Sequence, residues 1–300
     1  MRRRIARFRD GGVRNYAMSR AYLCVSVATV ADRDRGGGTR HPRSFQGVTD
    51  GVASRIHPFF ERFGAKPTYL LSADVLGDPG CLEAFRGLAP SSELGTHLDA
   101  ATSSERAALT EVTDLFIRAF GHQPQSFRAG PDGLGPDSIG ILESLGYAVD
   151  ASVTPYLGRS LEAPTQPYRP DPEEPGRPGD AAILEVPVTM RRHPLSAVPG
   201  LGRRIAPRGL APRRGTADGL VRLAEDEIAD ARRAAPTRPV ILHAVLDNVE
   251  VVPDASAHGA SEEQARGILD RLRALLVFAR RAGIPVVGLA DVPEILRLGA

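Results

Sequence analysis

Short apolar segments rich in β-branched residues alternate along the chain with longer amphipathic segments. This alternation is typical of βα units that build a parallel sheet or barrel. The expected strands cover residues 21–30, 67–73, 93–97, 126–130, 147–153, 182–188, 238–245 and 284–290. The sequence therefore predicts an α/β protein with a mainly parallel sheet.

The amphipathic segments carry apolar residues at helical spacing and recognisable ends. Residues 52–63 form one such face and Gly64 closes it, while His57-Pro58 is expected to kink it. A second helix should begin after Thr102, which has capping-box spacing with Glu105. Further helices are expected from Pro136 to Gly146, over residues 217–234, and after a cap at Ser261.

The chain organisation indicates one domain over residues 20–300, preceded by a basic segment, residues 1–19, that is expected to be disordered. That segment lacks the apolar stretch of a secretory signal, and Met18 is an alternative start. Two long loops, residues 155–181 and 199–215, flank one predicted strand, and loops of this length usually have a functional role. A cytoplasmic location follows by default.

Composition narrows the class of partner. The formal net charge is +2, from 38 basic and 36 acidic residues, so neither nucleic acid nor an anionic membrane is expected as partner. No run approaches the roughly 18 apolar residues of a membrane span. Cys24 and Cys81 are the only cysteines and are expected to be reduced core thiols. The class of partner that remains is a small-molecule or saccharide-like substrate.

Four polar residues stand where predicted strands end, which is where parallel α/β folds place their sites: His97, Arg128, Asp150 and His243. Each also has a plain structural interpretation. Either histidine could be a hydrogen-bonded core residue, and Arg128 could pair with Asp150. At the mouth of a barrel, however, His243 is expected to donate a proton near neutral pH.

Taken in order, these segments resemble the polysaccharide deacetylase family. The resemblance covers about residues 20–297, and it is strongest to the branch whose arginine motif reads Phe-Arg-Ala-Gly. It rests on "RSFQGVTDGVASRIHPFFERFGAKPTYLLSADVL", "ELGTHLD", "SFRAGPDGLGPDSIGILESLGYAVDASVTP", "ILEVPVT" and the tail from "RPVILHAVLDN" to "GIPVVGLADV". The fold it implies is an irregular (β/α) barrel with about seven strands.

The resemblance also implies a chemistry. Family members hydrolyse acyl-amide bonds with one divalent, zinc-like metal, held by a first-strand acid and two histidines. A first-strand aspartate acts as base, an arginine orients that base, and a late histidine is the general acid. The metal would acidify a bound water and polarise the amide carbonyl.

This sequence matches that pattern only in part. Arg128 in "FRAG", His243 in "ILHA" and His97 in "GTHLD" match the arginine, the late histidine and the first metal histidine. Asp99 stands where the second metal histidine is expected. Ser26 and Ala28 stand where the first-strand acids are expected, so the site looks eroded.

Two hypotheses follow. The first is a pocket without metal that binds or converts a soluble small molecule, with His243 as acid, Asp99 as base, and Arg128, Ser26 and Asp150 binding substrate. The second is a rebuilt metal hydrolase, in which His97 and Asp99 are joined by Asp32, Asp34 or Asp247. A catalytic zinc generally takes three protein ligands, so we favour the metal-free alternative. A purely structural scaffold fits less well, because polar residues persist at several strand ends.

Overall fold

A computed structural model describes residues 21–33, 44–99, 104–130, 134–193, 206–253, 255 and 261–298. The basic segment 1–19, Asp34 and Thr102 lie outside these ranges. Within them, no helix is both long enough and apolar enough to cross a membrane.

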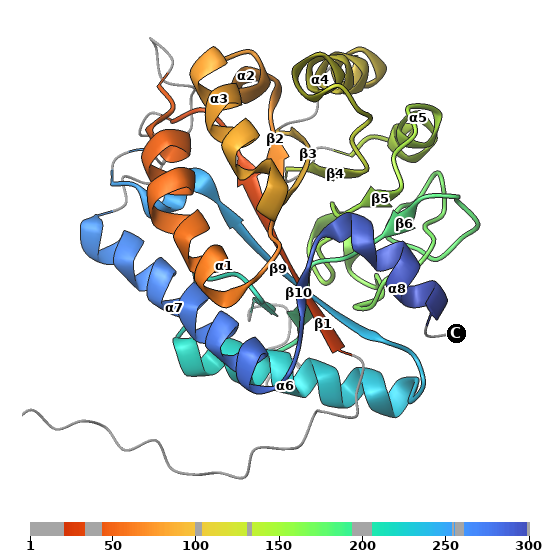
Figure 1. Cartoon of the computed structure of the whole chain (residues 1–300). Helices are drawn as coiled ribbons and strands as arrows, with labels where there is room; N and C mark the ends of the chain where they lie inside the picture. The colour runs from red at the N-terminus through yellow and green to blue at the C-terminus, as the bar shows by residue number, and fades with distance from the viewer. Residues whose placement is uncertain are drawn as a thin grey trace, which may run out of the picture.

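The strands form one curled parallel sheet with the order β9-β1-β2-β3-β4-β5-β6 (Figure 1). A short strand, β10, pairs in parallel with the amino half of β1. This architecture confirms the predicted irregular (β/α) barrel. The strands are β1 (Ala21–Thr29), β2 (Thr68–Leu71), β3 (Glu93–Leu98), β4 (Ser126–Ala129), β5 (Val149–Asp150), β6 (Leu184–Glu185), β9 (Val240–Asp247) and β10 (Val286–Val287).

Several strands are shorter than the sequence predicts. Apolar segments of seven residues around β5, β6 and β10 contribute only two ladder residues each. Their remaining backbone groups bond to loops, as in the isolated bridge between Tyr168 and Glu185. The antiparallel pair β7 (Met190–Arg191) and β8 (Arg208–Gly209) was not expected from the pattern.

Thr189 connects the last strand of the sheet back to β9. Its backbone N–H donates to the His243 carbonyl at 3.0 Å, and its side-chain oxygen accepts from the His243 N–H at 2.7 Å. The N–H of Ile241 is bonded to the Gln166 side chain and that of Val245 to the Leu210 carbonyl. Three loop residues thereby cover the edge of β9, which would otherwise expose unpaired backbone.

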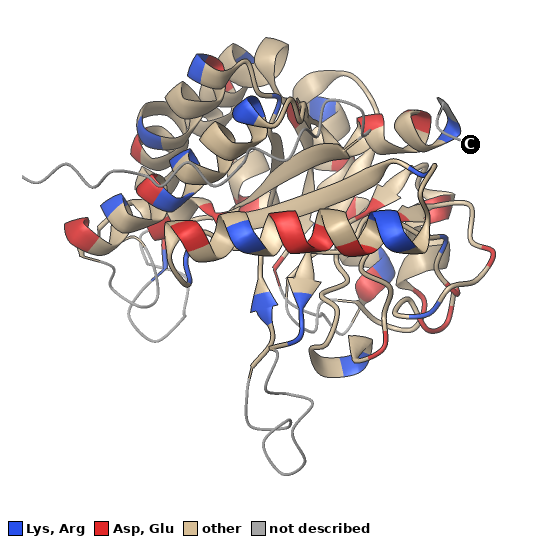
Figure 2. Cartoon of the chain, turned by 90° about the horizontal axis from the view of Figure 1, so that it is seen from below, with Lys and Arg blue, Asp and Glu red and all other residues tan. Residues whose placement is uncertain are grey.

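Helices cover the outer face of the sheet: α1 (His57–Phe63), α2 (Ala73–Leu76), α3 (Pro79–Leu88), α4 (Glu105–Phe120), α5 (Ser138–Ser144), α6 (Ala217–Ala234) and α7 (Glu262–Arg281). Helix α8 (Val292–Leu298) instead packs against the inner face, in a cluster with Cys24, Leu70 and Ile241. Leu23, Val25 and Val27 of β1 pack in one core cluster with residues of α1, α6 and α7. In the view of Figure 2 acidic and basic residues are interspersed, in keeping with the small net charge.

The helix ends test the sequence expectations individually. Ser261 and Gln264 form the expected reciprocal cap of α7, and Gly64 closes α1 in the left-handed conformation. The segment before Pro58 winds as a π-helix over Gly47–Ile56, so the chain changes its helical form there. Helix α4 begins at Glu105 with Ser104 as its N-cap residue, not directly after Thr102. Helices α2, α3 and α8 were not predicted. Both cysteines are buried and free, as expected.

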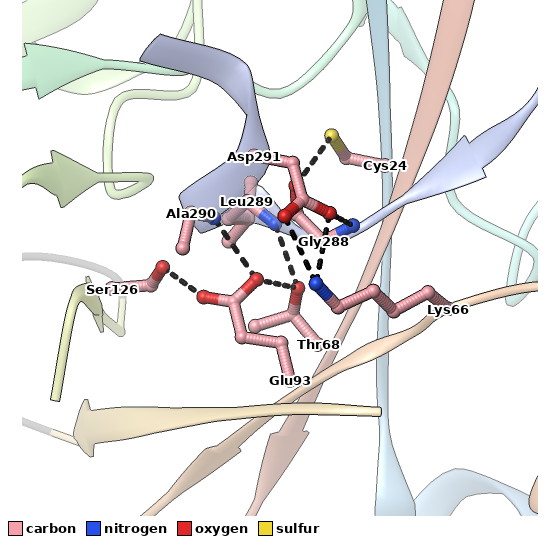
Figure 3. Close-up of polar contacts among 9 residues, drawn as sticks. All are labelled: Cys24, Lys66, Thr68, Glu93, Ser126, Gly288, Leu289, Ala290 and Asp291. Atoms are coloured by element: carbon pink, nitrogen blue, oxygen red, sulfur yellow. Dashed lines mark hydrogen bonds and ion pairs between the residues drawn. The ribbon is translucent and has the colours of Figure 1, made fainter. Parts of the chain in front are cut away.

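A buried glutamate joins the strands at their amino ends (Figure 3). Glu93, the first residue of β3, accepts hydrogen bonds from Thr68 of β2 at 2.9 Å and from Ser126 of β4. It also accepts from the Ala290 N–H at 3.0 Å, in the turn that leads into α8. Burial raises the pKa of Glu93, and the three hydrogen bonds partly offset that rise. One carboxyl group thus fixes β2, β4 and the C-terminal segment to β3.

We expect Glu93→Ala to lower the free energy of unfolding by about 3 kcal/mol, because buried donors then lose their acceptor. Urea unfolding at neutral pH measures this, with Glu83→Ala as control. The Glu83 side chain is 84% exposed and pairs with Arg86 on α3, so its loss should cost under about 0.5 kcal/mol. Equal stability of the two variants would show that Glu93 does not hold the amino ends together.

Candidate functional site at the carboxyl ends of the strands

Alternation along each strand decides which side chains point into the barrel. Leu23, Val25 and Val27 pack against the helices, whereas Cys24 belongs to a separate cluster with Leu70, Val149, Val186 and Ile241. Side chains two residues apart share a face of a strand, so Ser26 and Ala28 point inward with Cys24. The same rule places His97, Arg128 and His243 on the inner side, because their neighbours Thr96, Phe127 and Leu242 face outward.

Ser26 and His243 form a buried hydrogen-bonded pair on adjacent strands. The Ser26 Oγ lies 2.8 Å from His243 Nε2, and both residues have no exposed surface. His243 Nδ1 lies 3.0 Å from the Val186 carbonyl oxygen. Because a carbonyl only accepts, Nδ1 carries the hydrogen, and Nε2 accepts the hydroxyl proton of Ser26. The ring is fixed as the neutral tautomer at both ends.

The surroundings of His243 disfavour its protonation. Burial, together with the nearby Arg128 guanidinium, lowers the pKa of His243 to about 3. The imidazole is therefore neutral at neutral pH, which disfavours the predicted role of His243 as a proton donor in that range. Removal from water outweighs the two backbone carbonyls that favour the charged ring.

His97 and Arg128 occupy paired positions of β3 and β4. His97 Nδ1 donates to the Arg128 carbonyl oxygen at 2.8 Å, so Nε2 is the ring nitrogen that faces Asp99. The Arg128 guanidinium donates to the Ala151 carbonyl, and burial lowers its pKa. Asp247, Glu185 and Asp150 favour its charge from a distance. Among the described residues, no carboxylate forms an ion pair with it.

Asp99 lies just beyond the end of β3 and is held by a cation from the end of β1. Its Oδ1 is 3.9 Å from His97 Nε2, and its Oδ2 forms an ion pair with Arg33. The contact with His97, reinforced by Arg33, lowers the pKa of Asp99 to about 2. Asp99 is therefore an ionised, half-exposed carboxylate that already has a partner.

The described residues do not fit the metal site that the fold family implies. His97 and Asp99 provide two ligands, and a catalytic zinc generally takes three. Asp32 is fully buried and its oxygens accept from Ser44 and from the N–H groups of Gln46 and Gly47, at 2.6–2.9 Å. Asp247 caps the turn Asn248–Val251. Across the part of the chain that the structure describes, no group of three or more His, Cys, Asp or Glu side chains is suited to a metal ion.

The structure does not bring Asp150 to the inward-facing residues. Asp150 is paired in register with Phe127, whose side chain packs under α4 and α5, so Asp150 also faces outward. Its carboxylate accepts from the backbone and hydroxyl of Ser152, at 3.1 and 2.5 Å. Ser152 in turn accepts from the Ala129 N–H at 2.8 Å. Through Ser152, Asp150 thus supports the backbone next to Arg128 from the outer face of the sheet.

Glu185 is a buried partner of Asp150 that the sequence gave no reason to single out. The two residues are paired in register, and one oxygen of each is buried without a hydrogen-bond partner of its own. Burial raises the pKa of both groups, and the hydrogen bond between them raises that of Glu185 and lowers that of Asp150. A proton held by Glu185 and donated to Asp150 satisfies both oxygens.

Comparisons with known proteins support the fold and nothing finer. No model of a known protein family matches the chain, and no curated protein matches its sequence. Solved structures do match the fold. One is a putative polysaccharide deacetylase from Mycobacterium smegmatis, with a TM-score of 0.55 and 15% identity, covering 94% of this chain and 92% of the other. A probable polysaccharide deacetylase from Pseudomonas aeruginosa PAO1 gives 0.56 at 17% identity, covering 93% and 90%. The allantoinase Puue gives 0.58 at 16% identity, covering 93% and 91%.

These likenesses extend over nearly the whole chain. The chain therefore has the fold of the polysaccharide deacetylases, and the resemblance predicted from its motifs is confirmed at the level of the fold. At such low identity the shared fold does not carry over an activity.

The buried carboxyl pair should make stability depend on pH. Its raised pKa keeps Glu185 protonated in the folded protein, whereas an unfolded glutamate ionises near pH 4.3. The contribution of Glu185 is therefore complete below about pH 4 and declines as pH rises toward its folded pKa. In Glu185→Gln the fall in unfolding free energy between about pH 5 and pH 8 should be smaller than in the wild type.

Urea unfolding at both pH values measures this difference. Glu174→Gln is the control, because the Glu174 side chain is 57% exposed and should leave the pH dependence unchanged. A wild-type slope retained in Glu185→Gln would show that Glu185 does not hold the proton.

Proposed function

We propose that the protein is a divergent relative of the polysaccharide deacetylases that binds, or converts without a metal, a small molecule carrying an anionic group. The ligand, a free small molecule or one of saccharide-like character, would lie at the carboxyl ends of the strands. Arg128 would bind its anionic group, Ser26 and His243 would provide a neutral polar wall, and Asp99 would be the base if there is turnover.

The observation that carries the proposal is the Ser26–His243 hydrogen bond. In the family a carboxylate is expected on this strand, and it would both bind a metal and favour a protonated histidine. Here the partner is a neutral hydroxyl that donates to the ring, and the adjacent inward residue is Ala28. Neither supplies a negative charge, so this strand offers no metal ligand of the expected kind and nothing to hold a proton on His243.

The guanidinium of Arg128, which has no ion-pair partner among the described residues, is the reason for proposing that the ligand carries an anionic group. The arginine that would orient a first-strand base has no such carboxylate here. Only one of the five N–H donors of a guanidinium is bonded within the described residues, to the Ala151 carbonyl. A part-buried guanidinium without an ion-pair partner favours a planar anion such as a carboxylate, which it can bind with two parallel hydrogen bonds.

A second candidate function is a metal-dependent hydrolase of acyl-amide C–N bonds, using His97 and Asp99. One observation favours it. His97 donates from Nδ1 to the Arg128 carbonyl, which is the orientation by which ligating histidines present Nε2 to a metal. Such a site would still need a third ligand and would need Asp99 released from Arg33.

Metal titration distinguishes the two functions. We expect wild-type protein, purified without chelator or nickel resin, to show no stoichiometric zinc binding by calorimetry. Ser26→Asp/Ala28→Asp should bind zinc at least roughly tenfold more tightly, because it restores both first-strand acids of the family, one of which is a metal ligand. Ala28→Asp alone tests the same point if the double variant unfolds.

The control is Ser54→Asp/Ala107→Asp, which makes the same chemical changes at exposed positions. It should bind zinc no better than the wild type. A tight one-to-one zinc complex of the unmodified protein would contradict the metal-free function and support the hydrolase.

Anion binding by Arg128 can be measured as thermal stabilisation by acetate at constant ionic strength. A ligand that binds only the folded protein raises its melting temperature with concentration. We expect this rise in the wild type and in Arg118→Met, which removes an exposed arginine of α4, but not in Arg128→Met. An equal rise in Arg128→Met would exclude Arg128 as the anion-binding residue.

A further inference from the structure

Arg33 is a fixed positive charge at the place where the fold family would bind its metal. Arg33 lies four residues beyond the end of β1, and its backbone N–H donates to the Ala255 carbonyl oxygen at 2.9 Å. Its guanidinium forms an ion pair with Asp99, which lies one residue beyond β3. Strands β1 and β3, which pair with opposite edges of β2, thus deliver opposite charges to one point at their carboxyl ends.

The pair is placed so that Arg33 competes with any cation for Asp99. One carboxylate oxygen contacts Arg33 and the other lies 3.9 Å from the open Nε2 of His97. A divalent ion on His97 and Asp99 would have to share that carboxylate with a guanidinium. Like charges at such short range repel one another, and a guanidinium keeps its charge at every physiological pH.

The ion pair differs from an ordinary surface contact in having a buried histidine beside it. The side chains of Arg33 and Asp99 are 29% and 49% exposed, and the His97 side chain beside them is only 4% exposed. Arg55 and Glu262 form a similar pair elsewhere, with side chains 30% and 40% exposed, but with no histidine among their partners. Charge and position together, not exposure, distinguish Arg33.

We propose that Arg33 is a built-in cation that takes the place of the metal at Asp99, pairing with this carboxylate beside His97 and excluding divalent ions. This inference rests on the proposed metal-free function and names the residue that enforces it. Arg33 is then a specificity-determining residue, because it sets which charge the mouth of the barrel accepts.

The test measures Co²⁺ affinity by calorimetry and visible absorption for wild type, Arg33→Met and Arg33→Lys, and again in the Ala28→Asp background. Arg33→Met should bind Co²⁺ more tightly by about tenfold in each background, the order expected for removing one neighbouring charge. Arg33→Lys keeps the charge and should bind as weakly as its parent. Arg55→Met is the matched control and should change nothing.

If Arg33→Met binds Co²⁺ no better than Arg55→Met, the role of Arg33 is overturned while the metal-free function stands. Tight one-to-one binding by the wild type would overturn both.

Discussion

Strand β1 is hydrogen-bonded along both edges and buried on both faces, and this constraint governs the rest of the structure. It pairs with β9 along one edge, and with β2 and β10 along the other. A polar side chain on its inner face has no water to bind, so it needs a partner inside the barrel. Ser26 meets this need through His243, and the bond to Val186 then fixes the other side of the ring. The Val186 carbonyl thereby sets the tautomer of the residue that the family uses as an acid, and burial beside Arg128 keeps its ring neutral.

The acidic residues near the strands are mostly engaged in structural contacts. Glu93 joins the amino ends, and Asp150 with Glu185 supports β4 to β6 from the outer side. Asp32 accepts from the backbone at the start of the π-helix, and Asp247 caps the turn after β9. Asp99, by contrast, is half exposed at the carboxyl ends, and Arg33 balances its charge. Strand β1 has no inward carboxylate, so Arg128 has no ion-pair partner among the described residues. This is the basis for proposing that Arg128 binds an anionic ligand.

The fold that this chain shares with the solved structures does not by itself determine its chemistry. The solved structures it resembles include polysaccharide deacetylases and an allantoinase, at 15–17% identity. The fold brings the carboxyl ends of the strands together in a ring, where His97, Arg128 and His243 face inward. What happens there depends on which groups carry charge. The Ser26 hydroxyl and the Arg33 guanidinium change those charges while the barrel stays the same.

The sequence by itself determined the succession of the main strands and helices and the strand ends that carry His97, Arg128 and His243. These features are local, because the spacing of apolar residues within one segment encodes them. Only the tertiary structure decided that Ser26 binds His243, 217 positions away, and that Arg33 holds Asp99. It also turned Asp150 away from the site, toward Glu185, and lowered the pKa of His243 through burial. No local pattern specifies such pairs, since they arise only when distant segments are brought together and removed from water.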